Sequence, residues 1–364
     1  LIKLGVPAVK TAAAIAMGAI YGMIAPPINI PAMIIGGGVD MPYVGFALPL
    51  LVCTIPLAIF SALLLLWVAF GLAACGGFLP KSSDNRHNQP LSSAVQTGLR
   101  NMGSSPGEAM LVRIFKEEKA LEVWKRTTAG TFKLFKTYEI CAYSGDLGPK
   151  IKEGDRQSPE GFYTITPGLM NPRSSYYLAF NTGFPNKFDR VWGRTGSDLM
   201  VHGDCSSRGC YAMTDGGIAE IYALARESFK GGNQSFQLQI FPFRMTAAKL
   251  AQQASSPHIG FWKDIKEGYD LFELTKTPPA WDVCERQYIF NAAGGGALNP
   301  MGPCPAVIQN AALTERQQAD EIAYAAAVES EAQKAARAAA EAERQAAGAA
   351  AAKARGEAIG GFFS

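Results

Sequence analysis

Histidine is scarce in this chain: His87, His202 and His258 are the only three among 364 residues. The sequence also lacks a P-loop, a dinucleotide-binding fingerprint and the helix motif of metalloproteases. Its net charge is only +3, which is too small to indicate a nucleic-acid partner. These absences exclude nucleotide-driven chemistry and a recognisable zinc protease, and no cofactor is expected.

Charged residues are nearly absent before Lys81, which sets the N-terminal part of the chain apart. Residues 1–43 are weakly apolar, and because the chain opens on Leu1, a start at Met33 or Met41 stays open. Residues 44–75 form an apolar run without a charge, longer than the about twenty residues that span a bilayer. We expect residues 44–75 to enter a membrane, either as a retained helix or as a signal sequence.

The end of this run, Leu72-Ala-Ala-Cys75-Gly, resembles a bacterial lipobox, in which Cys75 is lipidated after cleavage. A retained transmembrane anchor and a lipoprotein both stay open, and both place the rest of the chain outside the cytoplasm. Residues 76–107 are polar and rich in turn-forming residues, so they predict a flexible linker.

Residues 108–250 carry the β-branched and aromatic density of a mainly β (α+β) domain. We expect one main helix at residues 217–230 and a glycine-punctuated connection or flap at residues 144–161. The expected strands are residues 110–115, 120–125, 131–142, 161–166, 176–181 and 236–241.

The segment from residue 198 to residue 215 concentrates reactive side chains. An apolar run ends at His202 and predicts a buried strand, a small-residue loop follows, and Thr214 or Asp215 is expected to cap the next helix. Cys210 would then lie near the positive end of that helix, where a thiolate is favoured. With His202 as its base, Cys210 predicts a nucleophilic cysteine, and the amides of Gly209 and Cys210 are candidate oxyanion donors.

Two other interpretations of this segment stay open. A buried structural cysteine beside an incidental histidine requires no chemistry at all. A zinc site formed by His202, Cys205 and Cys210 has suitable ligand types but no clear fourth ligand nearby. Cys205 is expected to have a local structural role, and a disulfide between Cys205 and Cys210 would inactivate the nucleophile.

The motif Met200-Val-His202-Gly-Asp-Cys-Ser-Ser207-Arg-Gly-Cys210-Tyr-Ala-Met-Thr-Asp215 resembles the signature of the L,D-transpeptidase (YkuD-type) catalytic domain, in its YafK-like murein branch. Further matching motifs extend the resemblance over about residues 108–250. They are Ser144-Gly-Asp-Leu-Gly-Pro-Lys150, Ser158-Pro-Glu-Gly-Phe-Tyr163, Gly183-Phe-Pro-Asn186, Arg194-Thr-Gly-Ser-Asp198 and Ile240-Phe-Pro-Phe-Arg-Met-Thr246.

The resemblance implies a β-sandwich-like fold and a role for each residue of the motif. Cys210 would be the acyl-accepting nucleophile, His202 the proton donor and acceptor, and the Gly203 carbonyl the group that orients the imidazole. Many family members have a second histidine where this chain has Arg208, which together with Ser207 is a candidate to bind substrate.

Two segments follow the domain. Residues 251–313 are aromatic and proline-rich and are expected to pack on the catalytic domain, with Cys284 and Cys304 as the natural disulfide pair of an oxidising compartment. Residues 314–364 are dominated by Ala, Glu, Gln, Arg and Lys, which favours a long solvated helix. This tail has no leucine-like seam, so a coiled coil is not predicted.

Together these features predict a periplasmic, membrane-tethered cysteine enzyme acting on peptidoglycan stem peptides. The resemblance implies an L,D-transpeptidase that crosslinks the wall or attaches an envelope protein to it. A hydrolase that detaches such proteins or crosslinks, and a non-catalytic murein-binding module, stay open as alternatives.

Overall fold

The computed structural model describes residues 56, 59–60, 63, 84–294 and 296–360. The chain divides into two units, Leu1–Ser83 and Asp84–Ser364, and nearly all described residues belong to the second. The predicted segments 1–43 and 44–75, including Cys75, lie outside the described residues apart from four helical positions. None of the helices in the described part is long and apolar enough to cross a membrane.

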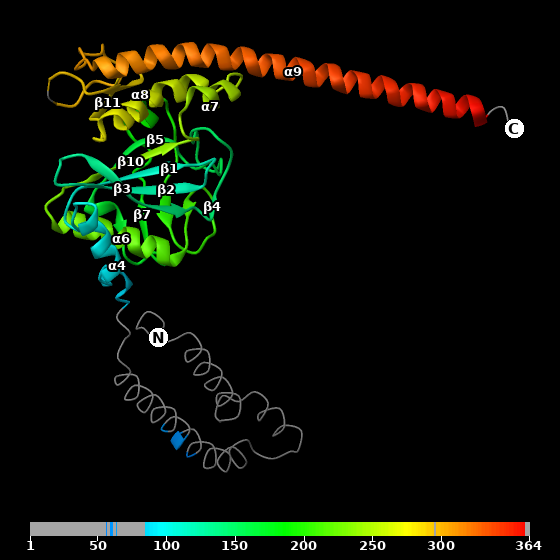
Figure 1. Ribbon diagram of the computed structural model, residues 1–364. Helices are drawn as coiled ribbons and strands as arrows, with labels where there is room; N and C mark the ends of the chain where they lie inside the picture. Colours follow the sequence, from blue (N-terminus) through cyan, green and yellow to red (C-terminus); the bar gives the residue numbers. More distant parts are fainter. Residues whose placement is uncertain (1–55, 57–58, 61–62, 64–83, 295, 361–364) are drawn as a thin grey trace, which may run out of the picture. The chain divides into compact units, whose positions relative to one another are not determined.

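A five-stranded sheet forms the centre of the second unit (Figure 1). Its order is β3 (Phe132–Glu139), β2 (Ala120–Arg126), β1 (Met110–Phe115), β10 (Phe236–Phe241) and β5 (Gly161–Ile165). β1 and β10 run parallel, and the other neighbours are antiparallel. We call this sheet the central sheet.

A second five-stranded sheet, which we call the site sheet, has shorter strands. Its order is β4 (Ala142–Tyr143), β9 (Tyr211–Ala212), β8 (Met200–His202), β7 (Ala179–Asn181) and β6 (Met170–Asn171). β8 and β9 are its parallel pair. The predicted strand 131–142 is divided between the two sheets, because the chain leaves β3 at Glu139 and enters β4 at Ala142.

The main hydrophobic core lies between the two sheets and α6 (Asp215–Lys230). Met110, Val112 and Ile114 of β1 belong to this core, whereas Leu111 and Phe115 belong to clusters on the opposite face, as the two-residue period of a strand requires. The Thr214 hydroxyl accepts the Gly217 amide at 3.1 Å and caps α6. This places the predicted helix two residues earlier than expected, from Asp215.

The opposite face of the central sheet is covered by residues from the predicted extension 251–313. These residues form α8 (Ile259–Thr275) and a hairpin of β11 (Trp281–Cys284) and β12 (Gln287–Phe290). An aromatic cluster joins them to Phe115, Phe162 and Phe241 of the central sheet. A disulfide joins Cys284 to Cys304, the pair that the sequence predicts. The unit also contains two shorter helices, α5 (Lys187–Val191) and α7 (Ala247–Gln252), and the 3-10 turn η3 (Pro167–Leu169).

The expectation of one main helix in residues 108–250 is met by α6, but the sequence did not predict a second long helix, α8, in the segment that follows. α8 has 17 residues, and its side chains Trp262, Ile265 and Tyr269 lie in the aromatic cluster. Because two lysines and two acids stand between Trp262 and Tyr269, the helical period of the apolar residues is hard to see before the packing is known.

The segment before the domain also differs from the prediction of a flexible linker at residues 76–107. From residue 84 onward it contains η2 (Arg86–Asn88) and α4 (Ser93–Asn101). Ser92 caps α4 by accepting the Val95 amide, and Val95 and Leu99 join the main core. Residues 76–83 lie outside the described residues.

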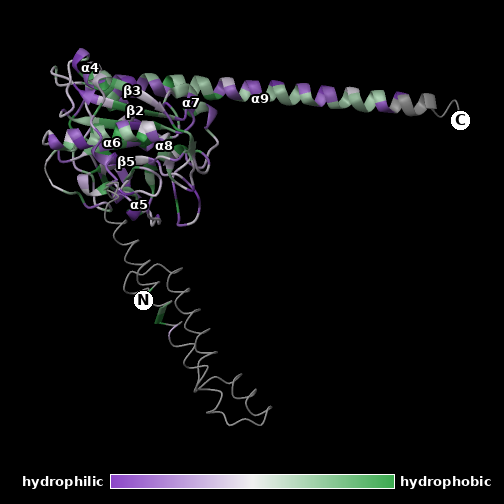
Figure 2. Cartoon of the chain, turned by 90° about the horizontal axis from the view of Figure 1, so that it is seen from below, coloured by the Kyte–Doolittle hydropathy of each residue, from purple (hydrophilic) through white to green (hydrophobic). Residues whose placement is uncertain are grey.

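The C-terminal helix α9 (Ala311–Gly360) covers the predicted tail. Its first turns contact α7 and α8, and the remainder projects away from them (Figure 1). Hydrophilic and hydrophobic residues alternate along the projecting part without a continuous apolar face (Figure 2). This helix therefore depends on its first turns for attachment.

Candidate active site

Cys210 and His202 lie on neighbouring parallel strands of the site sheet. His202 is the last residue of β8 and pairs with Ala212, and Cys210 immediately precedes β9. Continuing the register places Cys210 opposite Met200, in agreement with the 3.4 Å contact from the Met200 amide to Cys210 Sγ. Because side chains two residues apart on a strand share a face, Cys210 and His202 project from the same face of the sheet.

The imidazole of His202 is held by neutral groups. His202 Nδ1 lies 2.6 Å from the Gly203 carbonyl oxygen, and since a carbonyl only accepts, Nδ1 carries the proton and Nε2 is left as the proton acceptor. The Tyr176 ring lies over the imidazole, with 4.7 Å between ring centroids. Burial lowers the pKa of His202 below its ordinary value, although the Gly203 carbonyl and Asp204 oppose this shift.

The Cys210 thiol is free and half-buried, and its environment also favours the neutral form. Its S–H donates to the Asp198 carbonyl oxygen at 3.6 Å. Burial raises the pKa of Cys210, and the Met200 amide and the charge of Lys150 only partly offset this. The expectation of a thiolate stabilised by the helix end is therefore wrong, because α6 begins only at Asp215 and burial is the larger effect.

A chain of serine hydroxyls fixes the backbone of Cys210. Ser207 Oγ donates to the Cys210 carbonyl oxygen at 2.7 Å, and Ser158 Oγ donates to the same oxygen at 3.1 Å. Ser207 Oγ already gives its one proton to Cys210, so the Ser144 hydroxyl, 2.9 Å away, is the donor between these two serines. Ser207, predicted to bind substrate, thus holds the nucleophile's own peptide.

Gly209 occupies a position that glycine favours. Its φ is +127°, and an added Cβ would lie 3.3 Å from Leu199. Its amide donates to Ser207 Oγ at 3.3 Å, so the predicted oxyanion donor already has an acceptor. The Cys210 amide remains the second candidate named from the sequence.

The loop between β4 and β5 is held in place by the contacts of two carboxylates, Glu160 and Asp155. Buried Glu160 accepts hydrogen bonds from Lys116 Nζ at 2.9 Å, the Gly148 amide at 2.7 Å and Trp262 Nε1 at 2.8 Å. Asp155 bonds Lys150 Nζ and three backbone amides, and the lysine and these amides hold the pKa of Asp155 at about 2 against the opposing effect of its burial. These contacts describe a fixed connection, the alternative to a flap.

The disulfide between Cys141 and Cys205 was not foreseen from the sequence. It joins the loop between β8 and β9 to the segment before β4, and it gives Cys205 its structural role. Since the Cys205 sulfur is bonded to Cys141, it is no longer available to the zinc site weighed above. Among the described residues, no group of three potential metal ligands is found.

Three neighbours of the site were given no role from the sequence, although Ser144 and Ser158 each begin a motif that matches the family. Tyr176, Ser158 and Ser144 come from loops 34 to 66 residues before Cys210, and only the fold brings them to the site. Arg208 is exposed, which leaves its predicted contact with substrate as a proposal.

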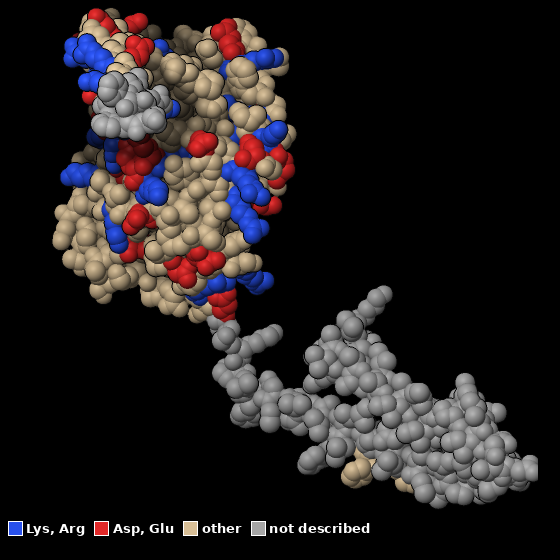
Figure 3. Space-filling model, turned by 90° about the vertical axis from the view of Figure 1, so that its right-hand side faces the viewer, with Lys and Arg blue, Asp and Glu red and all other residues tan. Residues whose placement is uncertain are grey.

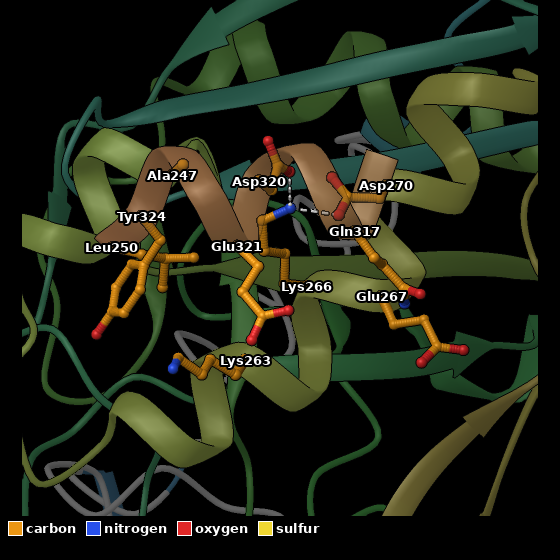
Figure 4. Close-up of a pocket in the computed structure, with 10 residues that line it drawn as sticks. All are labelled: Ala247, Leu250, Lys263, Lys266, Glu267, Asp270, Gln317, Asp320, Glu321 and Tyr324. Carbon is orange, nitrogen blue, oxygen red and sulfur yellow. Dashed lines mark hydrogen bonds and ion pairs between the residues drawn. The ribbon is translucent and has the colours of Figure 1, made fainter. Parts of the chain in front are cut away.

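A separate pocket of about 260 Å³ lies where α9 meets α7 and α8, and neither Cys210 nor His202 lines it (Figure 4). Lys266 Nζ bonds Asp320 of α9 at 2.5 Å and also bonds Asp270 of its own helix. Arg316 adds a 2.9 Å ion pair to Asp320. We call these four residues, Lys266, Asp270, Arg316 and Asp320, the α9 seat. Their charges are paired within the chain, so they attach the helix.

On the face shown in Figure 3, acidic and basic side chains are interspersed.

Comparison with known proteins agrees with the geometry. The family model described as "L,D-transpeptidase catalytic domain" (YkuD) matches residues 110–231. Proteins named "Putative L,D-transpeptidase YafK" from two Escherichia coli strains, K12 and O157:H7, are each 44% identical over 183 residues, which cover 50% of this chain and 74% of theirs.

Two solved structures of the helical cell shape determining protein Pgp2 from Campylobacter jejuni are also similar. One, of a point mutant, is 24% identical and covers 44% of this chain and 56% of that one, with a TM-score of 0.30. The other is 20% identical and covers 54% and 80%, also with a TM-score of 0.30. This chain thus spans just over half of the first of these structures. With such low TM-scores, these two likenesses support no conclusion.

Proposed function

This chain belongs to the L,D-transpeptidase family, and from that premise we propose that it is a cysteine-dependent acyltransferase of the cell envelope acting on peptidoglycan stem peptides. The acceptor is an amine, either of a second stem peptide or of an envelope protein. We place the reaction in the periplasm, with residues 44–75 as the membrane tether.

In the proposed reaction, Cys210 Sγ attacks the carbonyl carbon on the L-centre side of an L,D bond while its proton passes to His202 Nε2. The tetrahedral intermediate collapses with loss of the C–N bond, and His202 gives the proton to the leaving amine. The resulting thioester is attacked by the acceptor amine, whose proton passes to His202 and returns to the sulfur as the C–S bond breaks.

The observation that carries this proposal is that a neutral thiol and a neutral imidazole of fixed tautomer lie on neighbouring strands of the site sheet. The Gly203 carbonyl occupies Nδ1, so Nε2 is the base, and the directions of both pKa shifts keep the proton on sulfur until attack. Within the described residues, Cys210 Sγ bonds Asp198 and Met200 rather than His202. Catalytic hydrogen bonds often form only when substrate binds, so the absence of a resting bond between these two residues does not oppose the transfer.

The acyl-enzyme also leads to the alternative outcome. If water replaces the amine, the same thioester is hydrolysed and the protein detaches stem peptides or attached proteins. Arg208 bears on this choice because it stands, exposed, where many family members have a second histidine.

Mass spectrometry of the intact chain with purified stem-peptide fragments tests the proposal. We expect a covalent adduct on Cys210 and, with an amine acceptor present, new amide-linked products. Cys210→Ala should abolish both, and Ser206→Ala, an exposed change in the same loop, should abolish neither.

Shortened fragments without transfer at any acceptor concentration would make the protein a hydrolase. An unmodified Cys210 with unchanged fragment binding would leave only a murein-binding module. Equal products from the wild type and Cys210→Ala would contradict the cysteine mechanism altogether.

The pH dependence of kcat/KM gives an independent test. Below the pKa of His202 the imidazole is protonated and cannot accept the thiol proton, so the rate falls as the pH falls. Because burial lowers that pKa, we expect the acid limb to lie below 6.5, the ordinary imidazole value. An acid limb above 6.5 would contradict the neutral-pair mechanism.

A further inference from the structure

The segment just before the catalytic domain reaches the loop that covers His202. We propose that Arg86 is a positioning residue for the imidazole, acting through the loop Ser174–Tyr177. The inference rests on the proposed function only for its activity measurement, because the position of the ring can be observed without turnover.

Arg86 makes two contacts with this loop. Its NH2 group donates to the Ser174 carbonyl oxygen at 3.1 Å, and its guanidinium lies 5.3 Å from the centre of the Tyr177 ring. Asp84 pairs with the same NH2 group at 2.9 Å. A planar guanidinium suits this combination of hydrogen bond and ring contact, whereas a lysine ammonium is a point charge.

The segment that carries Arg86 is itself fixed to the domain. Arg226 of α6 donates to the His87 carbonyl oxygen at 2.5 Å and to the Gln89 carbonyl oxygen at 2.9 Å. Leu91 is buried in the main core directly afterwards. The segment that carries Arg86 is therefore fixed to α6 and the core, and Arg86 in turn holds the loop. We call the contacts of Arg86 with this loop the brace.

The loop in turn holds the histidine through two contacts of Tyr176. The carbonyl oxygen of Tyr176 accepts the Gly203 amide at 3.0 Å, and its ring covers the imidazole. Gly203 accepts the His202 Nδ1 proton through its own carbonyl. Arg86 thus contacts Ser174 and Tyr177, on either side of the residue that supports the imidazole, although 116 residues separate it from His202 in the sequence.

Loss of the brace should release the loop without changing any group that takes part in the proton transfer. The Tyr176 ring would no longer be held over the imidazole, and the Gly203 amide would keep only its second acceptor, the Leu178 carbonyl oxygen at 3.2 Å. We expect the catalytic step to suffer more than substrate binding, so kcat should fall while KM changes little.

Histidine NMR of the full-length chain in detergent tests this inference without substrate. The chain has only three histidines, so the His202 signal can be assigned with His→Gln variants. We expect Arg86→Ala to shift and broaden the His202 signal and to leave that of His258 unchanged. Arg100→Ala, an exposed arginine of α4, is the matched control and should shift neither.

Activity is measured on the same proteins. We expect kcat for Arg86→Ala to fall about tenfold, as for other residues that act through a packed network. Arg86→Lys should recover only part of this loss. If Arg86→Ala folds poorly, Asp84→Asn, which changes a half-exposed carboxylate, should shift the His202 signal in the same direction by a smaller amount.

An unchanged His202 signal in folded Arg86→Ala, or in Asp84→Asn where Arg86→Ala does not fold, would overturn the inference. So would a fall in kcat matched by Arg100→Ala. If the wild type has no activity on any stem peptide but the His202 signal still responds to Arg86, the proposed function fails and the brace stands.

Discussion

The reactive site and the α9 seat hold polar groups in opposite ways. Around Cys210 and His202 the contacts are neutral: hydroxyls, amides and carbonyl oxygens. At the α9 seat, Lys266 lies between two carboxylates, and Arg316 adds a second cation. A full charge in contact with the thiol or the imidazole would fix one protonation state, so neutral partners leave both groups free to exchange a proton.

The α9 seat has a different task. α9 offers the domain little apolar surface, and Leu313 and Tyr324 are its only residues packed against a described hydrophobic cluster. Ion pairs supply the attachment that its composition cannot. Neutral contacts thus preserve reactivity around Cys210 and His202, and charged contacts attach the helix at the α9 seat.

The largest effect should come from crowding the neutral site. In Gly203→Ala, the new Cβ would lie 2.4 Å from Asp215 Oδ1 and 3.0 Å from the Tyr176 carbonyl oxygen, so the Asp215 carboxylate, which holds the Asp204 amide, or the Gly203 backbone must move. A misplacement of about 1 Å at a catalytic group costs about 100-fold in rate, and we expect a loss of this order in kcat/KM. Gly216→Ala, where an added Cβ meets nothing within 4 Å, is the matched control for kinetics and melting. Similar kinetics for the two variants would contradict the role of the Gly203 carbonyl.

The sequence was informative where the signal is local. The strands at residues 110–115 and 236–241 match those in the structure, because aromatic and β-branched residues are dense there. The motif also correctly placed His202 at the end of a strand. The pKa of Cys210 was misjudged because burial is set by the whole fold, whereas a helix end can be read from a few residues.

What the sequence could not give depends on distant parts of the chain. Cys141 and Cys205 are separated by 64 residues, and nothing in the spacing of the cysteines specifies their pairing. The contact of Arg86 with Ser174 spans 88 residues and involves a backbone carbonyl, which has no sequence signature. α4 was missed because its two core residues, Val95 and Leu99, stand among polar neighbours.

The next largest effect is expected for the buried ion pair between Glu160 and Lys116. Glu160 and Lys116 are both fully buried, and Glu160→Ala leaves the lysine without its carboxylate. Breaking a buried pair in this way costs about 3–5 kcal/mol of unfolding free energy. Chemical denaturation measures it, and Glu153→Ala, an exposed acid of the same loop, is the control. Equal stability of the two variants would show that Lys116 is satisfied by the Asp146 and Gly148 carbonyl oxygens alone.

A smaller effect is expected at the α9 seat. Lys266→Ala removes the shared partner of Asp270 and Asp320, but burial raises the pKa of Asp270, and its protonation limits the cost. We expect a loss of about 1–3 kcal/mol and faster hydrogen exchange in the first turns of α9. Lys263→Ala in the same pocket removes only a ring contact with Tyr324 and should have less effect. Unchanged exchange in Lys266→Ala would mean that Leu313 and Tyr324 hold the helix without the ion pairs.

The smallest effect should come from an ion pair in the projecting part of α9. Lys334 and Glu331 lie 2.8 Å apart, the distance of a good ion pair, but the lysine side chain is 68% exposed. Water and salt screen such a pair, so Lys334→Ala should change the unfolding free energy by less than about 0.5 kcal/mol. Denaturation at low and high salt measures this, with Lys266→Ala run beside it. A loss at Lys334 as large as that at Lys266 would mean that the projecting helix is covered in solution, since only burial makes an ion pair of this length costly to break.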